Sequence, residues 1–133
     1  MNAFFGAYSD GGGASQGSPG RNYWFPTYRQ WLKLSQVSSP ANYFVTLDEH
    51  PDSINDGFFI NGTDVSAWSD LPASYHNGAC GFSFADGHAE VHKWLSRTSK
   101  YPVRFVYGTV AFDAAGRRDW AWYKERTGYL RIR

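Results

Sequence analysis

Apolar and polar residues alternate most clearly on the two sides of an Asp-Gly pair at positions 86 and 87. Before the pair, every second residue is apolar: Cys80, Phe82 and Phe84. After the pair, one set of alternate positions holds His88, Glu90 and His92, and the other holds Ala89, Val91 and Lys93. Alternate residues of a strand lie on the same face, and Asp-Gly is a strong signal for a hairpin turn. The pattern predicts a β-hairpin whose turn contains Asp86 and Gly87.

Three other segments are rich in the aromatic and β-branched residues that strands favour. Residues 43–47 and 57–60 are short apolar runs, and each predicts a buried strand. Residues 101–112 contain many Val, Phe and Tyr side chains and predict a further strand or strand pair. Together with the hairpin, these segments predict an antiparallel sheet.

Two segments predict short helices. In residues 26–34, Thr27 is a suitable N-cap, and Tyr28, Trp31 and Leu32 follow at helical spacing. Residues 120–127 are followed by Gly128, a common residue at the end of a helix. The expected fold class is therefore α+β, an antiparallel β-sheet with short peripheral helices.

Length and composition indicate one domain over residues 1–133. The only low-complexity stretch is a Gly/Ser-rich segment at residues 9–21, which predicts a flexible loop. Thirteen basic and twelve acidic residues leave a net charge of +1, so we expect no nucleic-acid partner. The single cysteine, Cys80, excludes an intrachain disulfide, and its apolar surroundings predict a buried, inert thiol.

Oxygen-bearing side chains are concentrated just after the strand expected at residues 43–47. Within ten positions lie Asp48, Glu49, Asp52, Ser53, Asn55 and Asp56. Calcium binds about six to eight oxygen ligands in flexible geometry, and such a loop suits it. Without a metal, Asp52 and Ser53 would cap a turn, and Asn55-Asp56-Gly57 would form another.

His76 is separated from Asp86-Gly87 by nine residues, and the intervening segment includes the Asn77-Gly78 turn signal. This spacing, with the acidic segment 48–57 before it, resembles the H-X9-DG region of the processing-associated C-terminal domain of prepilin-type, or pseudopilin-like, proteins. The similarity extends from about residue 2 to residue 127, and it is most specific between residues 48 and 92.

The resemblance implies a pseudopilin-like globular domain of a type II secretion or type IV pilus-like system, located outside the cytoplasm. It implies other pseudopilin subunits or secreted cargo as partners, and calcium as a stabilising ion. The calcium ligands carried over are Glu49, Ser53 and Asp86, with Asp48, Asp52 and Asp56 as local alternatives. The chain shows no export signal and no apolar run of the ~20 residues that a membrane helix needs. We therefore expect a truncated form of a longer parent that starts with a leader and a hydrophobic helix.

An enzyme is the alternative. His88, Glu90 and His92 share one strand face, and His76 could approach them across the hairpin. Imidazoles and a carboxylate are ligands for zinc, which would polarise a carbonyl and activate water in a hydrolase acting on a small ester or lactone. A solvated strand face, or a turn in which His76 bonds near Asp86, explains the same residues. The aromatic content of 19% also leaves a carbohydrate-binding module open.

Overall fold

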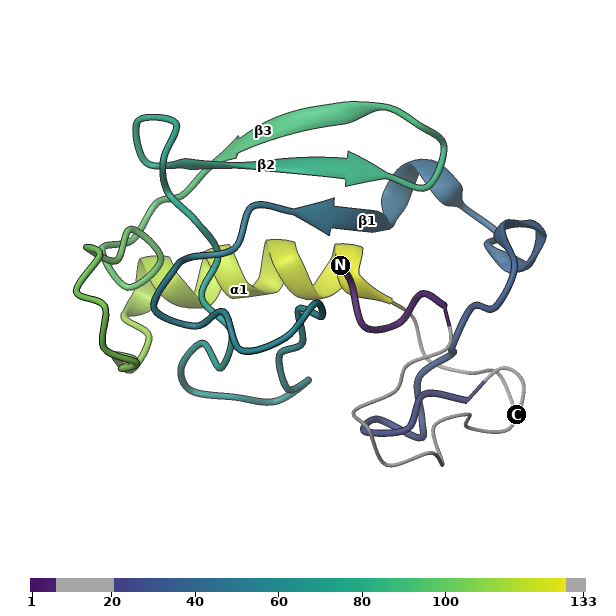
Figure 1. Ribbon diagram of the computed structural model, residues 1–133, viewed down its shortest axis with the longest axis horizontal. Helices are drawn as coiled ribbons and strands as arrows, with labels where there is room; N and C mark the ends of the chain where they lie inside the picture. The colour runs from purple at the N-terminus through teal and green to yellow at the C-terminus, as the bar shows by residue number, and fades with distance from the viewer. Residues whose placement is uncertain (7–20, 129–133) are drawn as a thin grey trace.

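The computed structural model describes residues 1–6 and 21–128, so most of the loop expected at residues 9–21 lies outside the described part. A three-stranded antiparallel sheet has the order β1-β2-β3, formed by β1 (Phe44–Leu47), β2 (Ala79–Phe84) and β3 (Ala89–Lys93). One α-helix, α1 (Ala114–Thr127), lies alongside it, and two 3₁₀ turns span Leu34–Gln36 and Pro40–Asn42 (Figure 1). The coarse prediction of a small α+β domain is confirmed.

The predicted hairpin is confirmed as β2 and β3. Cys80 pairs with His92 and Phe82 with Glu90, so the apolar positions of β2 share a face with His92 and Glu90 of β3. The connection is closed by the hydrogen bond from the Gly87 amide to the Phe84 carbonyl, 2.9 Å long. Gly87 has a φ of 95°, a left-handed conformation that glycine adopts without steric cost. The Asp-Gly signal therefore specifies this turn.

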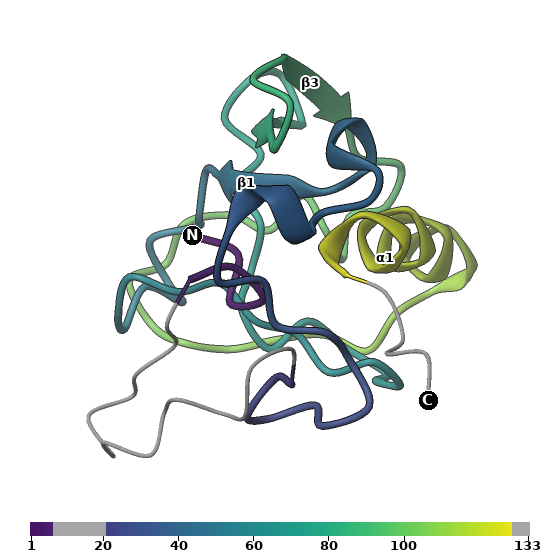
Figure 2. The ribbon, with the colours of Figure 1, turned by 90° about the vertical axis from the view of Figure 1, so that its right-hand side faces the viewer.

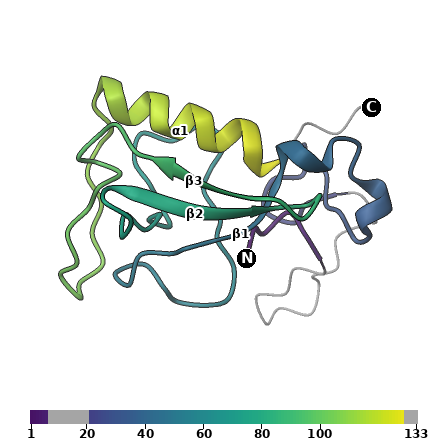
Figure 3. The same ribbon diagram turned by 90° about the horizontal axis from the view of Figure 1, so that it is seen from above.

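Helix α1 begins well before the segment predicted at residues 120–127. Asp113 is the N-cap, because its carboxylate accepts a hydrogen bond of 2.7 Å from the amide of Gly116. The helix runs along the sheet on one side, as the views along and above it show (Figures 2 and 3). Its Tyr123 packs against Phe44 of β1, and its Trp122 against Phe82 of β2. Burial of these rings supplies the main stabilisation of the layer between sheet and helix.

Two hydrophobic clusters make up the interior. The larger lies between sheet and helix and includes Phe44, Trp68, Phe82, Trp94 and Tyr123. The smaller gathers the N-terminal segment against the chain before β1 and includes Phe4, Phe5, Tyr28 and Trp31. Asn2 joins the regions, since its buried side-chain amide donates to the carbonyls of Phe44 and Thr127 at 2.7 and 2.9 Å.

The helix predicted at residues 26–34 is wrong. This chain segment is extended or turned, and it pairs with the N-terminal segment. The Trp31 amide donates to the Phe4 carbonyl at 2.9 Å, and the Gly6 amide donates to the Trp31 carbonyl at 2.8 Å. These long-range bonds occupy backbone groups that a helix would use internally.

Two predicted strands are also wrong. Residues 57–60 contribute only an isolated bridge, between Phe59 and Asn2. Residues 101–112 form no strand, and most of their apolar side chains before Phe112 are exposed, with Phe105 at 84%. Phe105 also has a φ of 56°, which interrupts any regular strand. A β-prone sequence becomes a strand only when its backbone pairs with another strand. Here two backbone amides of the segment bond instead to the side chain of Asp52.

Candidate functional site

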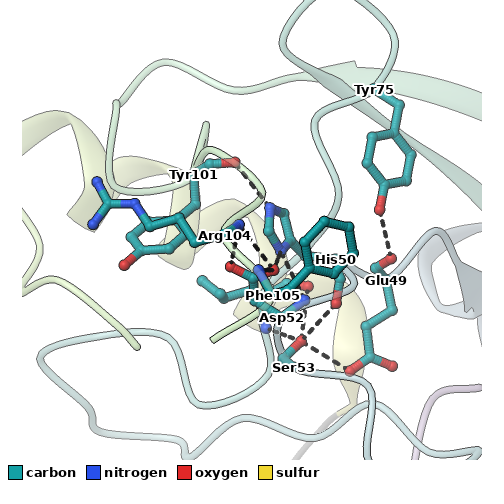
Figure 4. Close-up of polar contacts among 9 residues, drawn as sticks. Glu49, His50, Asp52, Ser53, Tyr75, Tyr101, Arg104 and Phe105 are labelled. Atoms are coloured by element: carbon teal, nitrogen blue, oxygen red, sulfur yellow. Dashed lines mark hydrogen bonds and ion pairs between the residues drawn. The ribbon is translucent and has the colours of Figure 1, made fainter. Parts of the chain in front are cut away.

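The acidic segment that leaves β1 is held against two other parts of the chain (Figure 4). Glu49 forms an antiparallel bridge with Pro72, and the His50 amide donates to the Leu71 carbonyl at 2.9 Å. The acidic segment thus follows directly after β1, but its residues 49 and 50 pair with residues 71 and 72, which precede β2. This pairing buries His50 completely, beside Asp52 and Ser53.

His50 has both ring nitrogens engaged. Its Nδ1 accepts a hydrogen bond from the Asp52 amide at 3.2 Å, and its Nε2 lies 2.9 Å from the Tyr101 carbonyl oxygen. Because a carbonyl can only accept, Nε2 carries the proton, and Nδ1 does not. This arrangement fixes the tautomer of a buried imidazole in a structural role, linking the acidic segment to residue 101.

Asp52 binds the exposed apolar segment through backbone amides. Its carboxylate accepts from the Arg104 amide at 2.9 Å and from the Phe105 amide at 2.9 Å (Figure 4). Charge-assisted bonds of this kind are stronger than neutral ones. These bonds explain why the backbone amides of residues 104 and 105 point towards Asp52 instead of pairing in a sheet. Asp52, expected as a metal ligand or a turn cap, is placed as a backbone anchor.

A hydrogen bond joins Ser53 and Glu49 within the acidic segment. The Ser53 hydroxyl accepts from the Leu71 amide at 2.9 Å and lies 3.0 Å from Glu49 Oε1, to which it donates. The pKa of Glu49 is raised to about 7, chiefly by burial and to a smaller degree by the negative charges of Asp70 and Asp56, while the Ser53 bond and the N-terminal ammonium partly offset this rise. Glu49 therefore holds a proton much more readily than an ordinary carboxylate.

Asp70 is an acidic neighbour that the sequence analysis missed. Its Oδ2 accepts from the Ile60 amide at 2.6 Å. Its pKa is raised to about 6, chiefly by burial and to a smaller degree by the charge of Asp56. The charge of Asp70 thus raises the pKa of Glu49, and that of Asp56 raises the pKa of Asp70, although Asp70 lies outside the acidic segment of residues 48–57. No local pattern around Asp70 signals this, because the proximity arises only from the path of residues 49–71.

The two ends of the H-X9-DG motif are engaged separately. His76 Nε2 lies 3.3 Å from Asp48 Oδ2, and the same oxygen accepts from the Gly81 amide of β2 at 3.2 Å. At the turn, Asp86 Oδ1 accepts from the His88 amide at 3.1 Å and also contacts His88 Nδ1. Bonding to His88 lowers the pKa of Asp86. The expected bond from His76 near Asp86 does not occur, because Asp48 takes that place.

The histidines of the hairpin lie against aromatic rings. His88 stacks on Phe84, with ring centroids 4.4 Å apart, and His92 stacks on Trp122 at 3.6 Å. Glu90 lies between them on β3 and is exposed. Within residues 1–6 and 21–128, no three His, Cys, Asp or Glu side chains are grouped so that they could hold a metal ion.

The predicted metal ligands are distributed over three places. Asp48 lies beside His76, Asp86 lies in the hairpin turn, and the remaining four lie in the acidic segment: Glu49, Asp52, Ser53 and Asp56. The Ala85 amide bonds to Tyr43 at the start of β1, whereas Glu49 follows its end. Asp86 and Glu49 are therefore separated by the length of β1, so one ion cannot contact both.

The predicted burial of the cysteine is confirmed. Cys80 is fully buried, and burial raises its pKa to about 12. Ser83 lies on the opposite, half-exposed side of β2, where its hydroxyl contacts Thr46. Neither side chain is placed as a nucleophile.

No protein-family model, curated protein or solved structure matches this chain. Among the described residues, no helix is both long and apolar enough to cross a membrane.

Proposed function

We propose that this chain is a pseudopilin-like globular domain with a structural role, from a type II secretion or type IV pilus-like system outside the cytoplasm. Its partners in the full-length parent would be other pseudopilin subunits or secreted cargo. The proposal is supported chiefly by how the motif residues are used. His76 and Asp86 mark the two ends of β2, and each is engaged with its own end of the hairpin.

The Asp48 carboxylate is central to this interpretation. Its Oδ2 accepts a hydrogen bond from the Gly81 amide of β2 and also contacts Nε2 of His76, which precedes the strand. Asp86 acts in a similar way at the other end, since it accepts from the backbone amide of His88. Because the polar groups of the motif bind their own chain, they fix the shape of the hairpin. A fixed shape suits a domain that must present a constant surface to its neighbours.

Calcium remains part of the proposal, at the acidic segment. Glu49 and Asp56 are the predicted ligands that act on each other electrostatically, and Asp70 adds a third carboxylate. A calcium ion bound there would relieve the repulsion between these carboxylates and lower the raised pKa values of Glu49 and Asp70. The described side chains are not gathered into a preformed metal cluster, so binding would draw them closer.

The test combines metal content with thermal melting in chelator and in calcium. We expect calcium to raise the melting temperature, and Glu49→Ala to abolish that increase. Asp86→Ala should lower the melting temperature but keep the calcium response, because Asp86 is part of the turn. Equal melting of the wild type in chelator and calcium would refute the calcium part. Unchanged melting of Asp86→Ala and His76→Ala would refute the structural role of the motif.

The alternative, a zinc-dependent hydrolase of a small ester or lactone, stays a prediction. It requires His76, His88, Glu90 and His92 to act together, whereas His88 and His92 are each stacked on a different ring. The alternative predicts turnover above the buffer rate on a panel of short esters and lactones, and its loss in His88→Ala and His92→Ala. Turnover that both variants retain, or its absence in the wild type, would reject it.

A further inference from the structure

An open pocket of about 490 Å³ lies apart from the hairpin motif. Its lining residues lie in three parts of the chain, at residues 24–25, 55–62 and 65–70. The side chains that give it chemical character are Trp24, Phe25, Asn61, Val65, Asp56 and Asp70. No Lys, Arg or His is among its described lining residues. The pocket thus combines aromatic rings with carboxylates and lacks a lining base.

The aromatic wall is available to a ligand. Trp24 is 50% exposed, and Tyr23 packs edge-on against it with ring centroids 5.1 Å apart. A bulky apolar ring that stays half in water contributes little to the core. Its face can instead attract a cation through the ring quadrupole, an effect that is strongest for tryptophan.

The carboxylates are positioned by the backbone. Asp70 Oδ2 accepts from the Ile60 amide at 2.6 Å, and Asp56 Oδ1 accepts from the Phe58 amide at 2.7 Å. Neither carboxylate makes an ion pair with a base among the described residues. Burial is the main cause of the raised pKa of Asp70; the charge of Asp56 raises it further, whereas the bond from the Ile60 amide and the N-terminal ammonium of Met1 lower it.

The buried amide of the pocket, that of Asn61, is already used. Asn61 is buried, its Oδ1 accepts from the Ser69 amide at 2.6 Å, and its Nδ2 donates to the Asp70 carbonyl at 3.0 Å. A sugar bound on Trp24 would need free amide or hydroxyl partners for its own hydroxyl groups. The exposed Asn55 amide and Ser69 hydroxyl also line the pocket, but its charged groups are the carboxylates of Asp56 and Asp70, and these favour a positively charged ligand over a neutral sugar.

We propose that this pocket binds an organic cation, an ammonium or guanidinium group, with Trp24 against its face and Asp56 and Asp70 as counter-charges. The cation belongs either to a free amine or to a basic side chain of a peptide. An Arg or Lys head group supplies N–H donors for the carboxylates and a charge for the ring. This inference does not depend on the hairpin motif, but it uses Asp56 and Asp70, which are also carboxylates of the proposed calcium site, so calcium and the organic cation would compete for them.

The experiment follows the indole N–H resonance of Trp24 by NMR during titration at neutral pH. The probes are the acetylated amides of arginine and lysine, the uncharged citrulline analogue of arginine, and a neutral disaccharide. We expect saturable shifts with the two cations in the millimolar range and none with citrulline. A lysine-centred pentapeptide that binds more tightly than the lysine amide would assign the source to a peptide. Equal affinities would assign it to a free amine, and both outcomes support the proposal.

Variants test the two sides of the site. Asp70→Asn keeps an oxygen for the Ile60 amide but removes the charge, and it should weaken cation binding about tenfold, measured by intrinsic fluorescence. Trp24→Ala, at a half-exposed position, should weaken it by a similar factor, measured by NMR on backbone amides of residues 60–70. Glu90→Gln, which changes net charge equally on the far hairpin, should leave the affinity unchanged.

Three results would overturn the proposal. They are equal binding of citrulline and arginine, saturation by the disaccharide alone, and cation binding that Asp70→Asn and Trp24→Ala leave unchanged while both variants melt as the wild type does. Absence of any shift with both cations up to the solubility limit would overturn it as well.

Discussion

His92 of β3 lies flat against Trp122 of α1, with ring centroids 3.6 Å apart and ring planes 10° apart. Trp94 meets the same imidazole edge-on at 4.9 Å. The contact joins the outer strand of the hairpin to the helix that covers the sheet. Because the ring is partly buried there, its protonated form loses hydration, and burial lowers the pKa of His92. The nearby charges of Asp119 and Glu90 act in the opposite direction and only reduce this effect.

Stability should therefore decrease at acidic pH through His92. The folded-state pKa lies below the unfolded value of 6.5, so this contribution is present above pH 6.5 and is lost as the pH falls through the folded pKa. NMR titration of the His92 ring should give a midpoint below 6.5. Trp122→Leu should shift that midpoint upwards, whereas Phe105→Leu, at an exposed ring, should not. A midpoint that Trp122→Leu leaves in place would contradict the stacking explanation.

The acidic pair Glu49 and Asp70 should act in the opposite pH direction. Their folded-state pKa values, about 7 and about 6, exceed the ordinary values of 4.5 and 3.8. Their contribution to stability is therefore present at pH values below the ordinary ones and is lost as the pH rises through 6 and 7. Glu49→Gln and Asp70→Asn should each be more stable than the wild type at about pH 8, with the difference vanishing near the ordinary carboxylate pKa.

Urea unfolding at several pH values measures this difference. Asp64→Asn removes an exposed carboxylate and serves as the matched control, for which we expect no pH-dependent gain. The prediction is contradicted if the free energy of unfolding depends on pH in the same way in the wild type, in Glu49→Gln and in Asp70→Asn.

Removing the Asp52 carboxylate should free the segment at residues 101–112. Asp52→Ala leaves the amides of Arg104 and Phe105 without their acceptor, and we expect a loss of about 1–3 kcal/mol in the free energy of unfolding. Asp52→Asn retains one acceptor oxygen and should lose less. Hydrogen exchange at the two amides should accelerate in Asp52→Ala before global unfolding does. Protection equal to that of the wild type would exclude the anchoring role.

Gly116→Ala should destabilise the protein, although alanine is the better helix former. A Cβ at Gly116 would collide with the Thr98 hydroxyl and come within 3.3 Å of Phe112 and Asp113 side-chain atoms. Overpacking of this kind costs about 1–3 kcal/mol, more than the gain in helix propensity. Gly57→Ala, where an added Cβ meets no atom within 4 Å, is the matched control. Chemical denaturation of both variants measures the difference, and a stabilised Gly116→Ala would refute the close contact.

The elements that the sequence predicted correctly depend on local signals. The strand of residues 43–47 is a short apolar run and forms β1 over Phe44–Leu47. The hairpin combines an alternating pattern with a turn that only a few residues favour, and Gly128 follows the end of α1. The first part of α1 was missed because residues 114–119 read Ala-Ala-Gly-Arg-Arg-Asp and lack an apolar stripe. Its start depends on the Asp113 cap and on contacts of Asp119 with the Leu95 and Ser96 amides.

The sequence alone determined the α+β class, the buried thiol and the hairpin, because neighbouring residues specify turn geometry and strand alternation. Tertiary structure decided the rest. The Asp52 carboxylate binds the backbone amides of Arg104 and Phe105, which lie fifty-two and fifty-three residues further along the chain. This contact replaces the strand that the Val, Phe and Tyr residues of segment 101–112 would favour. Asp70 joins Glu49 and Asp56 only after the chain has folded back. Such partners are set by the path of the whole chain through the core, and no local spacing encodes them.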